Sequence, residues 1–212
     1  MGGFTMNKGK YAIFIIIILL FIFIIGVPYI KDFIESKDPL KFNKAKSITL
    51  NKGTYIVGKD ISPGIYDIEI LAKEELQAFG KMLDNGDKLL GFRLSDNEKL
   101  YIEGDGSVKF SNASFQKLDK IKGNYVIKHS GQYIVGKQIP AGKYRVSYVD
   151  PKGELDSAPF IQVSKKIGKE IITSIDINNK NQVIQIEKNN ILMSAKTMHQ
   201  EHNHVEIILT PH

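Results

Sequence analysis

The stretch GTYIVGKDISPGIY at residues 53–66 returns later in the chain as GQYIVGKQIPAGKY at residues 131–144. Nine of the fourteen positions are identical, at a constant offset of 78. In each copy, Tyr-Ile-Val is typical of a strand, and the following segment with proline and glycine predicts a turn before a second strand. We therefore expect the same strand–turn–strand hairpin twice, in a chain built by duplication.

Eight aromatic and glycine residues occupy matched positions of the two copies, so they are the candidates for a structural motif. They are Tyr55, Gly58, Gly64, Tyr66, Tyr133, Gly136, Gly142 and Tyr144. We predict positive φ at Gly64 and Gly142, and a bulge or a close backbone approach at Gly58 and Gly136. The tyrosines have two interpretations: core rings whose hydroxyls hold a loop, which repetition favours, or a stacking platform for sugar rings or partner residues.

The similarity extends beyond this motif. LYIEGDGSVKFSNASF at 100–115 aligns with VIQIEKNNILMSAKTM at 183–198, at an offset of 83. Short alternating apolar runs between turn signals are typical of small all-β domains. The sequence therefore predicts two tandem homologous modules, 48–126 and 127–212, each a small antiparallel β-sandwich.

One segment has a helical pattern instead. In AKEELQAFGKML, residues 72–83, Leu76, Phe79 and Leu83 would lie on one face of a helix. Gly80 opposes this interpretation because glycine is unfavourable inside a helix. We expect the only helix downstream of residue 47 here.

The twenty residues 11–30 carry no charge, which predicts an uncleaved transmembrane helix after a short tail at 1–10. Residues 31–47 are polar and mixed in charge, as in a stalk. Five lysines at 31–46 against two at 1–10 favour a cytoplasmic carboxyl-terminal part by the positive-inside rule. Nearby acids, the free amino terminus and the charge tolerance of long domains oppose this. We expect the carboxyl-terminal part outside the cell.

The composition of the chain excludes several kinds of site and partner. The chain has no cysteine, so disulfides, thiolate metal sites and a lipoprotein anchor are excluded. Its net charge of +6 is scattered, without the basic cluster typical of nucleic-acid binding, so we expect no nucleic-acid partner. Of the carboxylates near the first motif, Asp60, Asp67 and Glu69, none aligns with an acid in the second copy. No catalytic motif is recognisable, and we predict neither a catalytic residue nor a cofactor.

The run HQEHNH holds the only clustered candidates for metal ligands, His199, His202 and His204. If a strand runs from residue 202 to 210, His202, His204 and Glu206 share one face and offer the nitrogen and oxygen donors that zinc takes. The alternative is a polar, solvent-facing start of a strand, and this is our expectation.

The repeated stretch resembles a module of uncharacterised Gram-positive membrane-anchored surface proteins, written YxVGxDIPAGxY. Here Ser62-Pro63 stands for the Pro-Ala of that pattern, and Gln138 replaces its Asp. The resemblance implies small all-β units in the cell envelope behind an anchor, and it implies no catalytic residue.

Three functions follow as hypotheses. The first is a non-enzymatic, single-pass membrane protein whose extracytoplasmic modules bind or scaffold a wall polymer, a glycan or a protein partner. The second is a metal-dependent envelope hydrolase that uses the HQEHNH cluster. The third is an accessory subunit of a secretion or conjugation complex.

Overall fold

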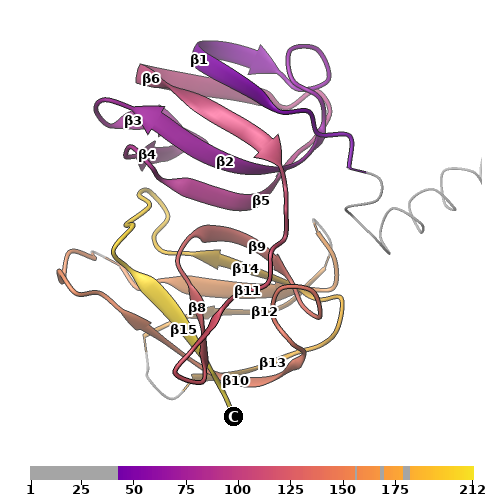
Figure 1. Ribbon diagram of the computed structural model, residues 1–212, viewed down its shortest axis with the longest axis vertical. Coiled ribbons are helices and arrows are strands. Elements are labelled where there is room, and N and C mark those ends of the chain that lie inside the picture. The colour runs from indigo at the N-terminus through magenta and orange to yellow at the C-terminus, as the bar shows by residue number, and fades with distance from the viewer. Residues whose placement is uncertain (1–42, 156, 168–169, 179–181) are drawn as a thin grey trace, which may run out of the picture. The chain divides into compact units, whose positions relative to one another are not determined.

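Strands are the only regular elements in the residues that the computed structural model describes, 43–155, 157–167, 170–178 and 182–212 (Figure 1). The prediction of an all-β chain is confirmed for these residues. The predicted anchor at 11–30 and most of the stalk lie outside them. Within the described ranges, no helix is long and apolar enough to cross a membrane.

Fifteen strands form two sheets in the described part of the chain. The first half contributes β1 (Ile48–Ile56), β2 (Gly64–Ala72), β3 (Leu76–Ala78), β4 (Lys81–Leu83), β5 (Lys88–Leu94) and β6 (Lys99–Asn112). The second half contributes β7 (Lys120–Ile121), β8 (Asn124–Ile127), β9 (Ser130–Ile134), β10 (Gly142–Val149), β11 (Phe160–Ser164), β12 (Ile171–Asp176), β13 (Gln182–Ile186), β14 (Ile191–Ala195) and β15 (Glu206–Pro211).

The larger sheet has ten strands in the order β12-β11-β14-β9-β5-β2-β6-β3-β4, with β1 paired to β6. The smaller sheet has five, in the order β13-β10-β15-β8-β7. Each half encloses its own apolar core, because alternate side chains of its strands point inward. In β2, for example, Tyr66, Ile68 and Ile70 are buried, and the Tyr66 ring packs edge-on against Phe110 at 5.6 Å.

Matching strands pair in the same way in both halves. β1 pairs with β6 and β2 with β5 in the first half; β9 pairs with β14 and β10 with β13 in the second. Gly53 lies opposite Ile102, and its counterpart Gly131 lies opposite Ser194. Ile102 therefore corresponds to Ser194, an offset of 92, and the sequence alignment at an offset of 83 is wrong. The sequence alignment matches the first part of β6 with β13, whereas the strand pairing matches it with β14.

The halves differ in one long strand. In the first half, β6 runs unbroken through fourteen residues, and it pairs with β1 from Lys99 to Phe110 and with β2 from Gly106 to Asn112. In the second half, the same course is divided into β14 and β15 by residues 196–205. Val108 lies opposite Ile70 in the first half, and Ile207 lies opposite Tyr148 in the second. Val108 therefore corresponds to Ile207, and the offset between matching residues rises from 92 to 99. The second half thus carries an inserted segment, and this segment contains all of HQEHNH.

Several contacts join the halves, among them a pair of strands and the inserted segment. β5 and β9 pair in parallel through Leu89 with Ser130 and Leu90 with Gly131, so the larger sheet is mixed and continues from one half into the other. The inserted segment also reaches the first half, where the Met82 N–H donates to the carbonyl of His199 at 2.8 Å. The two halves consequently form a single unit.

The predicted helix at 72–83 is wrong. The segment contains the end of β2 and the hairpin β3–β4, which turns at Phe79 (φ 55°) and Gly80 (φ 71°). Two consecutive positive φ angles are typical of a two-residue type I′ hairpin turn, and glycine favours them. Leu76 and Leu83 are buried by alternation along the strands rather than by helical spacing.

The last residues of the predicted stalk pack on the start of β2. The Asn43 side chain donates to the Ile65 carbonyl and accepts from the Ile65 N–H, both at 2.8 Å. Ala45 is buried, and the Lys46 N–H donates to the Tyr66 hydroxyl at 3.2 Å. Residues 43–47 are therefore part of the folded unit.

Candidate functional site

The four tyrosines of the repeated stretch share one contact, because each hydroxyl donates to the backbone carbonyl four residues earlier. The bonds run from Tyr55 to Asn51 (3.0 Å), Tyr66 to Ser62 (2.7 Å), Tyr133 to His129 (2.6 Å) and Tyr144 to Pro140 (2.9 Å). Tyr66, Tyr133 and Tyr144 are buried, and burial raises the pKa of each hydroxyl. These three rings are covered by the core and present no face for stacking on a sugar.

Gly58 and Gly136 hold the same turn after their strands. Their φ angles are 91° and 90°, a region that side chains other than glycine rarely adopt. The Gly58 N–H donates to the Ile61 carbonyl at 2.7 Å, and the Gly136 N–H donates to Ile139 at 2.6 Å. Backbone conformation therefore explains why glycine stands at both positions.

Gly64 and Gly142 do not have the positive φ that the sequence suggested, so that prediction is wrong. A Cβ at Gly64 would lie 2.7 Å from the backbone nitrogen of Ala45 and from the Asn43 side chain. A Cβ at Gly142 would meet only the Tyr144 ring, at an ordinary 3.5 Å. The first glycine is required by close packing of residues 43–47, and the second has no such neighbour.

The acids near the first motif make hydrogen bonds to the backbone and ion pairs with neighbouring strands. Asp60 accepts the Ile56 N–H at 2.8 Å, as Gln138 accepts the Ile134 N–H at 2.8 Å, so an amide replaces the acid without loss of the bond. Asp67 accepts from two backbone N–H groups, at Gly91 and Ser114, and Glu69 lies 3.3 Å from lysines on both neighbouring strands. No carboxylate pair for acid–base catalysis is formed by these residues.

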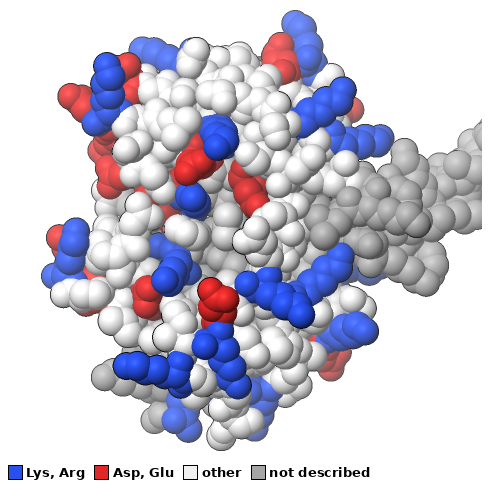
Figure 2. All heavy atoms as spheres, viewed as in Figure 1, with Lys and Arg blue, Asp and Glu red and all other residues white. Residues whose placement is uncertain are grey.

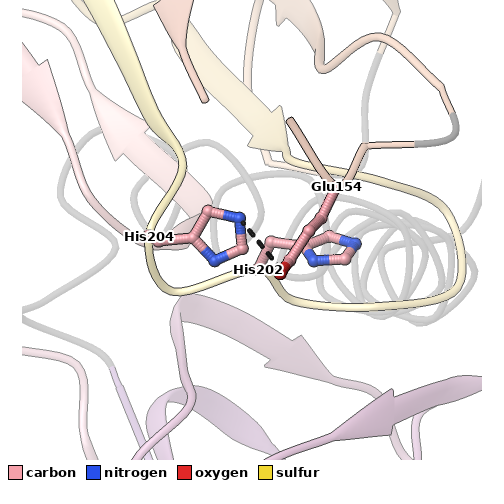
Figure 3. Close-up of side chains that lie close together, drawn as sticks. All are labelled: Glu154, His202 and His204. Carbon is pink, nitrogen blue, oxygen red and sulfur yellow. Dashed lines mark ion pairs between the residues drawn. The ribbon is translucent and has the colours of Figure 1, made fainter. Parts of the chain in front are cut away.

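The structure separates the three histidines. His202 and His204 lie together in a turn before β15, with ring centroids 5.6 Å apart, whereas the exposed side chain of His199 lies outside this group. The third member is Glu154, from the connection between β10 and β11 (Figure 3). One ligand atom from each of the three lies within 4.8 Å of the others. Glu206 is not part of the group, since β15 begins at that residue and its carboxylate pairs with Lys128 at 3.9 Å.

Asp150 organises the connection that presents Glu154. Its carboxylate accepts the backbone N–H groups of Lys152, Gly153 and Leu155 at 3.2, 3.0 and 3.1 Å. Desolvation alone would raise the pKa of Asp150, but these three bonds outweigh it and hold the pKa below its usual value. The Asp150 carboxylate also lies 3.2 Å from Nε2 of His204, so the site holds two acids and two imidazoles.

A second group of charges is buried where the inserted segment meets the first half. The side chains of Lys196 and Glu201 are 1% and 0% exposed, and their charged atoms lie 3.4 Å apart. Lys81 from β4 lies 3.9 Å from the other Glu201 oxygen and donates to the Thr197 carbonyl at 2.6 Å. Glu201 also accepts the Ser130 N–H at 2.8 Å. These contacts connect β4, β9 and the inserted segment.

Burial dominates the electrostatics of this group. Desolvation lowers the pKa of Lys81 and of Lys196, and the charge of Glu201 partly offsets the effect on both. Asp87 is also buried, and desolvation raises its pKa to about 6. Its Oδ2 accepts the Asp84 N–H at 2.7 Å, while Oδ1 makes no hydrogen bond to a described protein atom.

Two hollows open on the surface of the described unit near polar side chains. The larger, of about 790 Å³, opens where β1, β2 and β6 meet, and its polar lining comes from Asn51, Lys52, Lys73, Asn85, Asp105 and Ser107. The smaller, of about 450 Å³, is lined by Asp150 and by β10 residues Ser147 and Tyr148. On the face shown in Figure 2, acidic and basic side chains are interspersed, as on a solvated surface.

Sequence reasoning missed Glu154, Asp150 and the buried pair of Lys196 and Glu201. Glu154 is far from the histidines in the sequence, and nothing local signals that the two connections meet. The sequence alignment gave no signal of the inserted segment, because its offset of 83 matched the wrong strands. No family model, curated protein or solved structure matches this chain.

Proposed function

We propose that this chain is a non-enzymatic, membrane-anchored protein of the cell envelope that binds or scaffolds a polar wall polymer. In this proposal it comprises two copies of one small β-sandwich, at 48–126 and 127–212, displayed outside the cell by the helix at 11–30. The matched pairing of β1, β2, β5 and β6 with β9, β10, β13 and β14 supports the duplication.

The larger hollow is the observation that carries the binding function. Its lining combines amide, hydroxyl and ammonium groups, which suit the hydroxyls and phosphates of a wall polymer. Lys52 and Lys73 supply two positive charges there, with Asp105 as the one acid in the lining. In the repeated motif, the tyrosine hydroxyls and the N–H groups of Gly58 and Gly136 donate their hydrogen bonds to backbone carbonyls. Binding is therefore assigned to a surface outside the motif.

Co-sedimentation of the full-length chain with purified Gram-positive wall material tests this function. We expect the chain to pellet with the wall and the double variant Lys52→Gln/Lys73→Gln to stay largely in solution. The matched control is Lys59→Gln/Lys143→Gln, which removes the same charge at exposed positions outside the hollow. Equal pelleting of both double variants would contradict the proposed surface.

Protease treatment of intact cells tests the location separately. An epitope at the carboxyl terminus should be removed while the cells remain intact, since the proposed topology exposes residues 48–212. An epitope that survives in intact cells and disappears only after lysis would contradict the extracytoplasmic assignment.

A further inference from the structure

Three potential metal ligands converge from two separate connections. Nε2 of His204 lies 3.6 Å from the Glu154 carboxylate, and Figure 3 shows the Glu154 side chain extending towards both imidazoles. Bonds of 2.0 to 2.1 Å to tetrahedral zinc place two ligand atoms about 3.3 to 3.4 Å apart. The separation of His204 and Glu154 is close to this value, and the ligand atom of His202 lies within 4.8 Å of both.

Nε2 of His204 has no ordinary partner. It is buried from solvent and makes no hydrogen bond to a described protein atom, although Asp150 lies at 3.2 Å and Glu154 at 3.6 Å. Asp150 is near enough for a hydrogen bond but is not aligned with the nitrogen, and Glu154 is too far away. A buried nitrogen of this kind costs free energy unless another group satisfies it. A metal ion at the centre of the group would do so.

Both ligand-bearing connections are held by their own contacts. Asp150 fixes residues 150–155 through three backbone bonds. The His202 carbonyl accepts both the Lys196 ammonium at 2.8 Å and the Val205 N–H at 3.0 Å. The ligands therefore start from ordered backbone, which lowers the entropy that metal binding must overcome.

The local charge also favours a cation. Two acids, Asp150 and Glu154, lie beside His204. Of the cations near the site, Lys196 pairs with Glu201, and Lys152 pairs with Glu154 at 3.8 Å. That ion pair is more than half exposed on both sides, so it contributes little and is easily displaced. Asp150 already accepts three backbone N–H groups, so it adds negative charge beside the site rather than a fourth ligand.

We propose that Glu154, His202 and His204 bind one divalent transition-metal ion, with zinc as the best match. Two imidazole nitrogens and one carboxylate form a donor set that zinc takes readily and calcium does not. Bound there, the ion cross-links the β10–β11 connection to the inserted segment that contacts the first half. His199 has no part in it, so the donor set differs from the histidine run that the sequence displays.

Calorimetric titration of the full-length chain, free of affinity-tag histidines, with zinc chloride tests the site. We expect one zinc ion per chain, with His202→Gln and His204→Gln weakening binding at least about 10-fold. Glu154→Gln should weaken it as well, and because Glu154 is half exposed this variant removes a ligand without disturbing the core. His199→Gln is the matched control, because it removes a histidine of the same run and should bind like the parent.

Thermal melts give a second readout. Zinc at about 100 times its dissociation constant should raise the melting temperature of the parent and of His199→Gln by about 5 to 10 °C. It should leave the melt of Glu154→Gln unchanged or raise it far less. The site is refuted if the parent binds no zinc, if Glu154→Gln binds like the parent, if calcium binds equally well, or if His199→Gln loses binding.

Discussion

The two halves of this chain share a framework and differ in one connection. Where β6 crosses the first half without a break, the second half interrupts the same course with residues 196–205. This segment carries the buried pair of Lys196 and Glu201 and also the histidines beside Glu154. The repeated parts supply hydrogen bonds to the backbone, and the unrepeated part supplies the unusual chemistry. Differences between the copies are thus more informative about function than their identities.

Removing the buried acid of the inserted segment should have the largest effect on stability. Glu201→Gln leaves Lys196 buried without its counter-charge, which should cost about 3 to 5 kcal/mol. Thermal unfolding of the full-length chain should show a loss of about 6 to 20 °C. Glu206→Gln is the control, because its ion pair is exposed and should contribute less than about 1 kcal/mol. Equal melting of the two variants would mean that the buried pair does not hold the segment.

The two matched glycines that begin β2 and β10 should respond differently to the same substitution. In Gly64→Val the new side chain meets Ala45 and Asn43, so residues 43–47 must shift, at a cost of about 1 to 3 kcal/mol. In Gly142→Val the side chain meets only the Tyr144 ring at contact distance, and the change should stay within about 1 kcal/mol. Urea unfolding of both variants measures the difference. A larger loss for Gly142→Val would contradict this account.

Sequence reasoning succeeded where a local pattern decides the structure. The strand–turn–strand course of the repeated stretch follows from its apolar runs and its glycines, and it is present in both copies. The predicted hairpin is wrong, because β1 pairs with β6 rather than with β2, and β9 and β10 lie in different sheets. The prediction of a helix at 72–83 failed, because Leu76, Phe79 and Leu83 satisfy helical spacing while Phe79-Gly80 forms a hairpin turn.

The candidate site was predictable only in part. HQEHNH identified two of the three proposed ligands, but the partner that brings them together, Glu154, depends on tertiary contact. The burial of Lys196 and Glu201 has no local sequence signal, because a charged side chain is buried only when the fold supplies a partner.

Asp87 should make the parent less stable at neutral pH. Its pKa in the folded chain is about 6, against 3.8 for the ordinary group. As the pH rises from about 4 to 6, the unfolded chain releases this proton first, so the contribution of Asp87 to stability falls over that window. Asp87→Asn removes this dependence, and at pH 7.5 it should raise the melting temperature by about 2 to 4 °C, or about 1 kcal/mol. The gain in melting temperature should vanish near pH 4. A gain that is independent of pH would contradict the raised pKa of Asp87.

The smallest difference concerns two tyrosines at the same position of the repeat. Tyr133 is buried and donates to His129 at 2.6 Å, so Tyr133→Phe should cost about 1 kcal/mol. Tyr55 makes the same contact with Asn51, but where water can replace it, and Tyr55→Phe should cost less than about 0.5 kcal/mol. Urea midpoints of the two variants provide the comparison, and a larger effect at Tyr55 would reverse it.

The central claim is that the inserted segment and the β5–β9 pair make the two halves one cooperative unit. Differential scanning calorimetry of the full-length chain tests it most directly. We predict that both halves unfold together in a single transition, with equal calorimetric and van't Hoff enthalpies. Glu201→Gln should move that whole transition to lower temperature. Two separate transitions in the parent, or a shift confined to one of them in the variant, would contradict the claim.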